Sequence, residues 1–240
     1  MDEKKTRRGY VDTDEREFSE EHLIVLKNAQ QEIHWLLDRG YPIKNAVTFV
    51  GNHYTLSNRQ RLALSRATSP SVSIAERKNK EVSVCANQTV SIDGLNLIIT
   101  LEVALSGSVL IRCMDGTIRD LAGLRGTYRL IDKTDIAIAL IGNKLRSMNI
   151  TRAEFYLDAP VSNTGRLKAR ILEQMNKYGY DICVELSGNV DMLLKSKPYV
   201  VTSDAIILND CVSWINIAEA IVSENIGNAR CIDLNYKNEN

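Results

Sequence analysis

The fold of this chain is decided by a stretch near its middle, Thr89-Val90-Ser91-Ile92-Asp93-Gly94-Leu95-Asn96-Leu97-Ile98-Ile99-Thr100-Leu101-Glu102. A short run rich in β-branched residues ends at an acid and a glycine, and an apolar segment with helical character follows at once. This order is typical of the first strand of a parallel α/β sheet and the helix after it. Ligands of such sheets bind beyond the carboxyl ends of the strands, so we expect Asp93 at a functional position and Asn96 directed at the same place. The alternative is that Asp93 only caps the helix and Gly94 makes the turn.

The composition of the chain excludes several classes of protein. Of its 240 residues, 44% are hydrophobic and 25% charged, which is ordinary for a globular protein. Thirty basic and thirty acidic residues cancel, so any site for a polyanion must be a local patch. The five cysteines are scattered and form no C-x-x-C pair, which argues against zinc and disulfides and favours a reducing cytoplasm. With no secretory signal and no apolar run long enough to span a bilayer, a cytoplasmic protein without membrane partners is expected.

The residue pattern divides the chain into three regions. Residues 1–18 are highly charged and are expected to form a flexible leader. Residues 19–80 carry apolar positions at helical spacing and a capping box of Ser57 and Gln60, so a small all-α domain is expected. In residues 81–240, short β-branched runs alternate with helical segments. This alternation predicts an α/β domain, a mostly parallel three-layer sandwich of the Rossmannoid kind.

Within the α/β region, the Asp115-Gly116 turn predicts a hairpin of residues 109–113 and 117–119. Further strands are expected over residues 153–157, 181–186, 198–202 and 230–234. The helices expected between them cover residues 134–145, 165–178, 189–194 and 214–222.

Aspartates follow three of the expected strands, and a fourth begins the helix before the last of these strands. They are Asp93, Asp158, Asp204 and Asp191. Because the carboxyl ends of parallel strands share one edge of the sheet, these four carboxylates are expected to converge there. Converging carboxylates repel one another unless cations share the site, and Mg²⁺ or Mn²⁺ binds through carboxylates, water and phosphate oxygens. The four are therefore candidate metal ligands and catalytic residues, the alternative being that some of them only cap helices.

A second candidate site is the helix start in Ser162-Asn163-Thr164-Gly165-Arg166-Leu167-Lys168. Small polar residues at a helix start leave backbone N–H groups free to bind an anion. Arg166 and Lys168 add positive charge, so Ser162, Asn163, Arg166 and Lys168 are candidate phosphate ligands. The alternative is a serine-capped helix with a solvated basic face. The motif is not a Walker A loop, because the Gly-Lys-Ser/Thr ending is missing.

A third candidate is a basic cluster in the helical region, made of Arg59, Arg61, Arg66, Arg77, Lys78 and Lys80. Such side chains can bind a nucleic-acid backbone, so Arg59 and Arg66 are expected to contact substrate, as is Ser203 beside the acids. Together with residues 166–170 they are expected to form one basic surface flanking the acid cluster. The alternative is an ordinary solvated helix face.

Two family resemblances rest on these motifs. From about Gln88 onward the chain is similar to the PIN-like/NYN nuclease superfamily, in Ile92-Asp93-Gly94-x-Asn96, in an acid after the next core strand, and in Asp191 followed by Val200-Val201-Thr202-Ser203-Asp204. Nearly everything after the leader resembles a two-region prokaryotic family, the domain of unknown function 434. That second resemblance rests on Trp35-Leu36-Leu37-Asp38-Arg39-Gly40-Tyr41-Pro42, on Arg59-Gln60-Arg61-Leu62-Ala63-Leu64-Ser65-Arg66, on residues 92–102 and on residues 156–168. The chain departs from many PIN domains in the short spacing of Asp191 and Asp204 and in lacking the usual mid-helix acid.

The first hypothesis for function is a metal-dependent phosphodiesterase, a PIN-like ribonuclease with a helical substrate-binding domain, using Mg²⁺ or Mn²⁺ and acting on RNA. One alternative is a non-catalytic module that binds RNA or a nucleotide. Another is a Rossmann-like enzyme acting on a small phosphorylated substrate at residues 163–168. The sequence leaves the oligomeric state open, with a homodimer among the alternatives.

Overall fold

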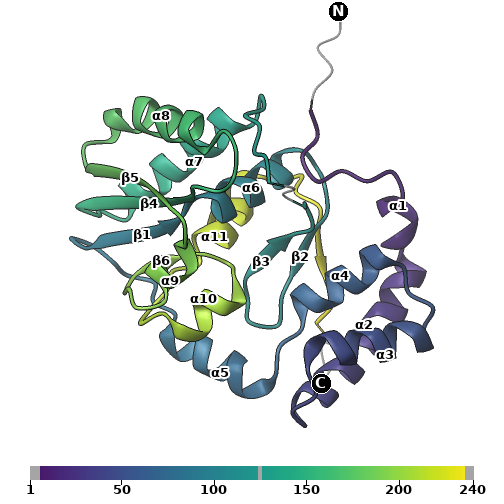
Figure 1. Ribbon diagram of the computed structural model, residues 1–240. Helices are drawn as coiled ribbons and strands as arrows, with labels where there is room; N and C mark the ends of the chain where they lie inside the picture. The colour runs from purple at the N-terminus through teal and green to yellow at the C-terminus, as the bar shows by residue number, and fades with distance from the viewer. Residues whose placement is uncertain (1–5, 124–125, 236–240) are drawn as a thin grey trace, which may run out of the picture.

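The computed structural model describes residues 6–123 and 126–235. Within these residues, the centre of the protein is a sheet of four parallel strands in the order β5-β4-β1-β6 (Figure 1). The strands are β1 (Thr89–Asp93), β4 (Arg152–Asp158), β5 (Asp181–Ser187) and β6 (Val200–Val201). The predicted fold class, a mostly parallel α/β sheet flanked by helices and preceded by a helical region, is confirmed.

The path of the chain through this sheet creates a position for a site. From β1 the chain passes to β4 and β5 on one side, and it then returns to β6 on the other side of β1. The order of the strands therefore reverses beside β1, which is where open α/β sheets form a ligand-binding crevice at their carboxyl edge. Asp93 is the last residue of β1 and pairs with Tyr156 of β4, so it lies at this edge.

Helices cover both faces of the sheet. They are α6 (Gly94–Leu105), α7 (Thr134–Ser147), α8 (Thr164–Met175), the 3₁₀ turn η1 (Asn176–Tyr178), α9 (Val190–Leu194), α10 (Ala205–Asp210) and α11 (Ile217–Asn225). One face packs a core with α6, α7, α8 and α11, to which Ile92 and Phe155 contribute. The other face packs Tyr156 and Val200 against α9, α10 and Trp214. None of the described helices combines the length and the apolar character that crossing a membrane requires.

The helical region is not packed as a separate domain. It consists of α1 (Asp14–Glu17), α2 (Glu20–Leu37), α3 (Ile43–His53), α4 (Asn58–Ala67) and α5 (Ser71–Lys80). A second, smaller sheet in the order β3-β2-β7 lies beside it, formed by β2 (Leu110–Arg112), β3 (Ile118–Asp120) and β7 (Cys231–Asp233). Ile111 and Ile232 of this sheet share one apolar core with Leu26 and Leu64 of the helices. The expected boundary at residue 80 is therefore crossed by continuous packing.

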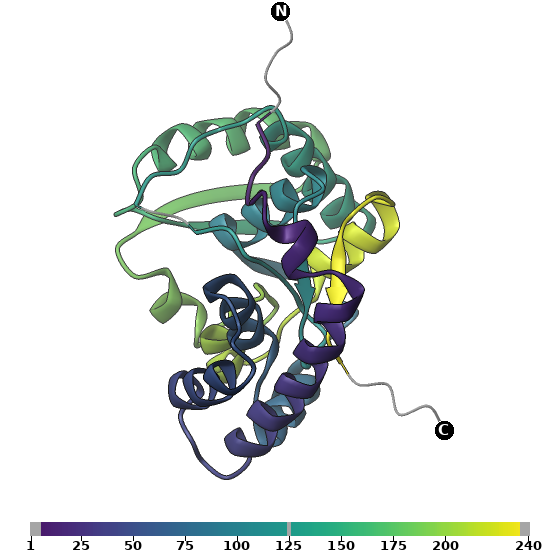
Figure 2. The same cartoon turned by 90° about the vertical axis from the view of Figure 1, so that its right-hand side faces the viewer.

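The N-terminal segment differs from the expected flexible leader, because its described residues, 6–18, are held against the rest of the protein. Arg8 pairs with the fully buried Glu102 at 2.7 Å, and Asp14 is buried against Arg59 at 2.8 Å. Phe18 packs into the core of the helical region. Figure 2 shows the segment, in purple, running from the helices of the α/β region to α2. The charge composition of this segment did not predict its contacts with the rest of the protein, because its charged residues form ion pairs with residues far away in the sequence. Residues 1–5 lie outside the described residues.

Candidate functional site

A cavity of about 470 Å³ lies at the carboxyl edge of the main sheet, where the strand order reverses. It is lined by all four predicted aspartates, Asp93, Asp158, Asp191 and Asp204. The predicted residues Asn96, Ser203 and Arg66 also line it, and Ser65, Arg119 and Asp120 line it without having been predicted. The structure thus brings together residues from β1, β4, α9 and the β6–α10 connection with an arginine of the helical region.

Asp93 is the most constrained of the four acids. It caps α6, as the simpler interpretation of its sequence position proposed, but its Oδ1 accepts only a long bond, 3.4 Å, from the Asn96 N–H. Its Oδ2 accepts a hydrogen bond of 2.9 Å from the Thr202 hydroxyl. Burial, with a smaller contribution from the charges of Asp204 and Asp158, outweighs those two bonds and raises the pKa of Asp93 to about 7. The residue is therefore both a helix cap and a carboxyl group that titrates near neutral pH.

The segment Thr202-Ser203-Asp204 is joined to Asn96 across the carboxyl edge. The Ser203 N–H and hydroxyl both donate to Asn96 Oδ1, at 2.9 and 3.0 Å. Because both donors meet the same atom, they identify it as the amide oxygen, and the Asn96 Nδ2 has no hydrogen-bond partner among the described residues. Asp204 caps α10 by accepting from the Ile206 N–H at 2.7 Å. The Asn96 Nδ2 group, with its two N–H donors, thus remains available at the cavity.

Asp158 and Asp191 form the other acidic side of the cavity. Burial raises the pKa of Asp158, and the charge of Asp191 adds to this effect. Asp191 itself is exposed, in the first turn of the short helix α9. Within the described residues, no lysine, arginine or histidine forms an ion pair with any of the four aspartates. No ion pair thus neutralises the acid cluster within the described residues, although Arg66 and Arg119 line the same cavity.

The acidic side chains lie farther apart than the ligands of a formed metal centre do. Over residues 6–123 and 126–235, no three His, Cys, Asp or Glu side chains stand close enough together to hold one metal ion. The four aspartates nevertheless border the same cavity, where Asp191 is exposed and Asp158 is half-buried. Carboxylate oxygens of this kind are the ligands that Mg²⁺ and Mn²⁺ prefer.

Arg66 faces the acids from the C-terminal turn of α4. Its Nη1 donates to the backbone carbonyl of Asp120 and, at 3.4 Å, to the Asp120 carboxylate. Its Nε and Nη2 have no partner among the described residues, and the side chain is 33% exposed at the cavity. A planar guanidinium with free donors fits a phosphate or carboxylate group of a ligand.

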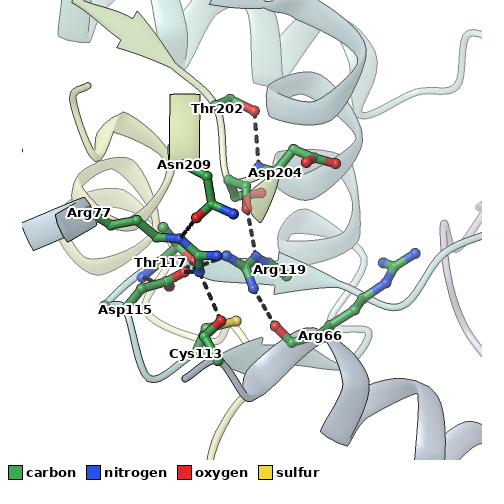
Figure 3. Close-up of polar contacts among 12 residues, drawn as sticks. Arg66, Arg77, Cys113, Asp115, Thr117, Arg119, Thr202, Asp204 and Asn209 are labelled. Carbon is green, nitrogen blue, oxygen red and sulfur yellow. Dashed lines mark hydrogen bonds and ion pairs between the residues drawn. The ribbon is translucent and has the colours of Figure 1, made fainter. Parts of the chain in front are cut away.

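Arg119 and Asp120 were not predicted, although they line the cavity. Both belong to β3, the second strand of the predicted hairpin, and both are buried. Arg119 donates to the Ser203 carbonyl at 2.6 Å and also to the Arg66 carbonyl and the Asp115 carboxylate (Figure 3). A signal was present, because two charged residues follow one another in a short strand that the hairpin pattern places in a sheet. The sequence does not show which residues pair with Arg119 and Asp120, so this pattern alone did not reveal whether the two charges are buried or exposed to solvent.

The phosphate site predicted at the start of α8 does not line the cavity. Val161 belongs to the lining, but Ser162, Asn163, Arg166 and Lys168 do not. Asn163 has a left-handed backbone, and its side chain donates to the Tyr128 carbonyl at 2.9 Å. Arg166 is exposed.

Two arginines of the predicted basic surface, Arg59 and Arg77, are engaged inside the protein rather than exposed on it. Arg59 donates twice to Asp14 and also to the carbonyls of Gly9 and Leu121, so it ties the N-terminal segment down. Arg77 is buried against Asp115, and Arg170 pairs with Asp135. Of the arginines in the predicted cluster, Arg66 is the one that reaches the cavity.

Comparison with known proteins places the chain among relatives of undetermined activity. Residues 25–80 match the family described as "Protein of unknown function (DUF434)", and residues 82–220 match the "Domain of unknown function (DUF5616)". An uncharacterized protein of Methanocaldococcus jannaschii is 35% identical over 203 residues, which cover 82% of this chain and 97% of that protein. No solved structure matches the chain. The two matched regions and the near full-length relative show that this chain belongs to the family in which a DUF434 region is followed by a DUF5616 domain.

Proposed function

We propose that this protein is a metal-dependent phosphodiesterase, a PIN-like ribonuclease, that works at the carboxyl-edge cavity. One observation carries the proposal: four aspartates from separate elements border a single cavity and none of them is paired with a protein cation within the described residues. Burial raises the pKa of both Asp93 and Asp158, and the charges of the neighbouring acids add to this effect. A bound divalent ion relieves this repulsion, so the cluster fits Mg²⁺ or Mn²⁺.

Asp93, Asp158, Asp191 and Asp204 would hold the ions. When bound, such ions lower the pKa of a water molecule and offset the negative charge of a phosphodiester during attack. The protein's own groups have separate tasks. Arg66 binds the non-bridging oxygens of the phosphate through its free Nε and Nη2, and the Asn96 Nδ2 donates a hydrogen bond from the opposite wall.

The substrate is proposed to be RNA, bound from the helical side. Ser65 and Arg66 of α4 line the cavity, so the helical region contributes to the site directly. The five free cysteines fit a reducing cytoplasm, where RNA is available. An RNA-binding module without activity is the second candidate, because the aspartates are not drawn together as in a formed metal centre. The candidate enzyme acting at residues 163–168 has no support from the cavity lining.

The test is cleavage of a mixed set of labelled RNAs by the whole chain with Mn²⁺, with Mg²⁺ or with chelator. We expect ion-dependent cleavage by the unmodified protein and a loss of about 10²–10³-fold in Asp93→Asn, because that change removes charge where the ion binds. Asp181→Asn is the matched control, since Asp181 is exposed and begins β5 at the opposite edge of the sheet. It is expected to cleave like the unmodified protein.

Two results would count against the proposal. If the unmodified protein cuts no RNA with either ion, the chain by itself is not a nuclease. If it then binds RNA equally well with and without Asp93→Asn, the binding module is the better interpretation.

A further inference from the structure

A buried charge cluster lies beneath the cavity and joins the helical region to the α/β region. Its centre is Asp115, in the turn of the β2–β3 hairpin, whose side chain is fully buried. Its Oδ2 accepts from Arg77 Nη1 at 2.7 Å and from Arg119 Nη2, and its Oδ1 accepts from the Thr117 hydroxyl at 2.6 Å (Figure 3). Burial opposes the charged form, but Arg119, Thr117 and Arg77 together lower the pKa of Asp115. The cluster is thus a buried carboxylate shared by two arginines, with a net positive charge.

Arg119 connects this unit to both walls of the cavity. Its Nε donates to the Ser203 carbonyl at 2.6 Å, and Ser203 in turn donates twice to Asn96, on the acid wall. Its Nη1 donates to the backbone carbonyl of Arg66, the residue that faces the acids. A single planar group therefore fixes the acid wall and the arginine wall relative to each other.

We propose that Arg119 is a positioning residue that sets the separation between Arg66 and the Thr202–Asp204 segment, and hence the width of the site for a phosphate with its metal ions. It acts through the two backbone carbonyls and is itself anchored by Asp115. The proposal rests on the function proposed above, because it assigns Arg119 a role in that same site. It goes beyond that function because it unites the helical and α/β regions in a single site with a fixed geometry.

Only arginine can make this connection. The guanidinium presents donors in three in-plane directions, and all three are used by acceptors in separate segments. Lysine keeps the positive charge beside Asp115, but its single nitrogen lacks the three separate donor nitrogens that the guanidinium directs at these acceptors. Arg77 donates to the same Asp115 oxygen and also to Ser69 and Asn209, so it supports Arg119 without touching the Ser203 or Arg66 carbonyl.

The experiment compares Arg119→Lys with Arg59→Lys in the whole chain. Arg59 is the matched control, because it too is an arginine with one carboxylate and two carbonyl acceptors and is mostly buried, but it lies outside the cavity lining. Hydrogen exchange is measured at the Ser203 amide and at Phe155 in the buried strand β4, which reports global opening. Binding of Mn²⁺ alone is measured by electron paramagnetic resonance.

In Arg119→Lys we expect the exchange rate of the Ser203 amide to increase about tenfold more than that of the Phe155 amide. We also expect the Kd for Mn²⁺ to rise about tenfold. In Arg59→Lys, Ser203 and Phe155 should change in parallel, and the Mn²⁺ affinity should stay the same. If the exchange rates of Ser203 and Phe155 also change by the same factor in Arg119→Lys, Arg119 has only a structural role and the inference is overturned.

Two further results keep the inference separate from the proposed function. If the unmodified protein binds no Mn²⁺, the proposed function fails, while exchange at Ser203 still decides whether Arg119 positions the segment. If Arg119→Lys does not fold, Arg77→Lys takes its place, because it weakens the anchor at Asp115 and leaves the contact with Ser203. An increase in the exchange rate at Ser203 alone, smaller than tenfold and absent from Arg59→Lys, then supports the inference. An equal increase at Ser203 and Phe155 overturns it.

Discussion

At the scale of single residues, the carboxyl group of Asp93 makes the protein less stable as the pH rises. Its pKa is about 7 in the folded protein, against 3.8 for an unperturbed aspartate, because of burial and the neighbouring acids. The folded state therefore holds this proton more tightly than the unfolded chain. Stability contributed by the protonated group is present below about pH 4 and is lost as the pH rises through about 7.

The change Asp93→Asn should reverse this effect in the metal-free protein. Asparagine carries no charge to desolvate, although it leaves the Thr202 hydroxyl without a carboxylate acceptor. We expect the free energy of unfolding at pH 8 to rise by about 2 kcal/mol and at pH 4 to change little. Urea denaturation at both pH values measures it, with Asp181→Asn as the exposed control. A loss of stability at pH 8 would show that the carboxylate is not strained by its surroundings.

The sequence predicted one wall of the site and missed most of the other. Asp93, Asp158 and Asp204 could be found because an acid at the end of a β-branched run is a local pattern, and parallel pairing brings such ends together. Arg119 could not be found in this way, because its role depends on Ser203, Arg66 and Asp115, which only the folded structure brings around it. Arg59 was assigned to substrate for the converse reason, since its partner Asp14 lies in a segment that composition alone described as loose.

At the scale of elements, the turn from β1 into α6 depends on a close approach to β4. A Cβ added at Gly94 would lie 2.6 Å from Leu157 Cδ2 and 3.2 Å from the Tyr156 carbonyl oxygen. The buried leucine has little room to move, so Gly94→Ala should lower the free energy of unfolding by about 1–3 kcal/mol.

Gly165→Ala is the control for that substitution. Gly165 also lies in the first turn of a helix that follows a parallel strand, but a Cβ there meets nothing within 4 Å. It should be neutral or stabilising by roughly 0.5 kcal/mol, because alanine favours a helix more than glycine does. Urea midpoints for both variants measure the difference. Equal midpoints would mean that the β1–α6 junction has room that the structure does not show.

Local patterns predicted most elements, and their limits have physical causes. The capping box of Ser57 and Gln60 is present, and the hairpin forms at the predicted turn. Helix α11 begins at Ile217, later than predicted, because Trp214 lies in an extended segment that bridges to Glu81 and Val200. Helix α10 was missed because it is only 6 residues long, a length at which apolar periodicity carries little information.

At the scale of the whole molecule, the helical and α/β regions form a single structure around the cavity. The predicted last strand exists, but it pairs with β2 in the small sheet and packs on the helices. Such pairing joins residues more than a hundred positions apart, and no pattern within one segment reveals it. The division at residue 80 followed the change from helical to alternating patterns, and described residues from both sides of it share one apolar core.

The most direct test of the proposed metal site is a crystal of the whole chain soaked with Mn²⁺ at pH 8, above the pKa of about 7 that Asp93 has in the metal-free protein. We predict an anomalous peak within the cavity, coordinated by the Asp93 carboxylate and at least one of Asp158, Asp191 and Asp204, and no such peak in Asp93→Asn. An empty cavity at saturating Mn²⁺, with these four side chains unmoved, would contradict the claim that they form a metal site.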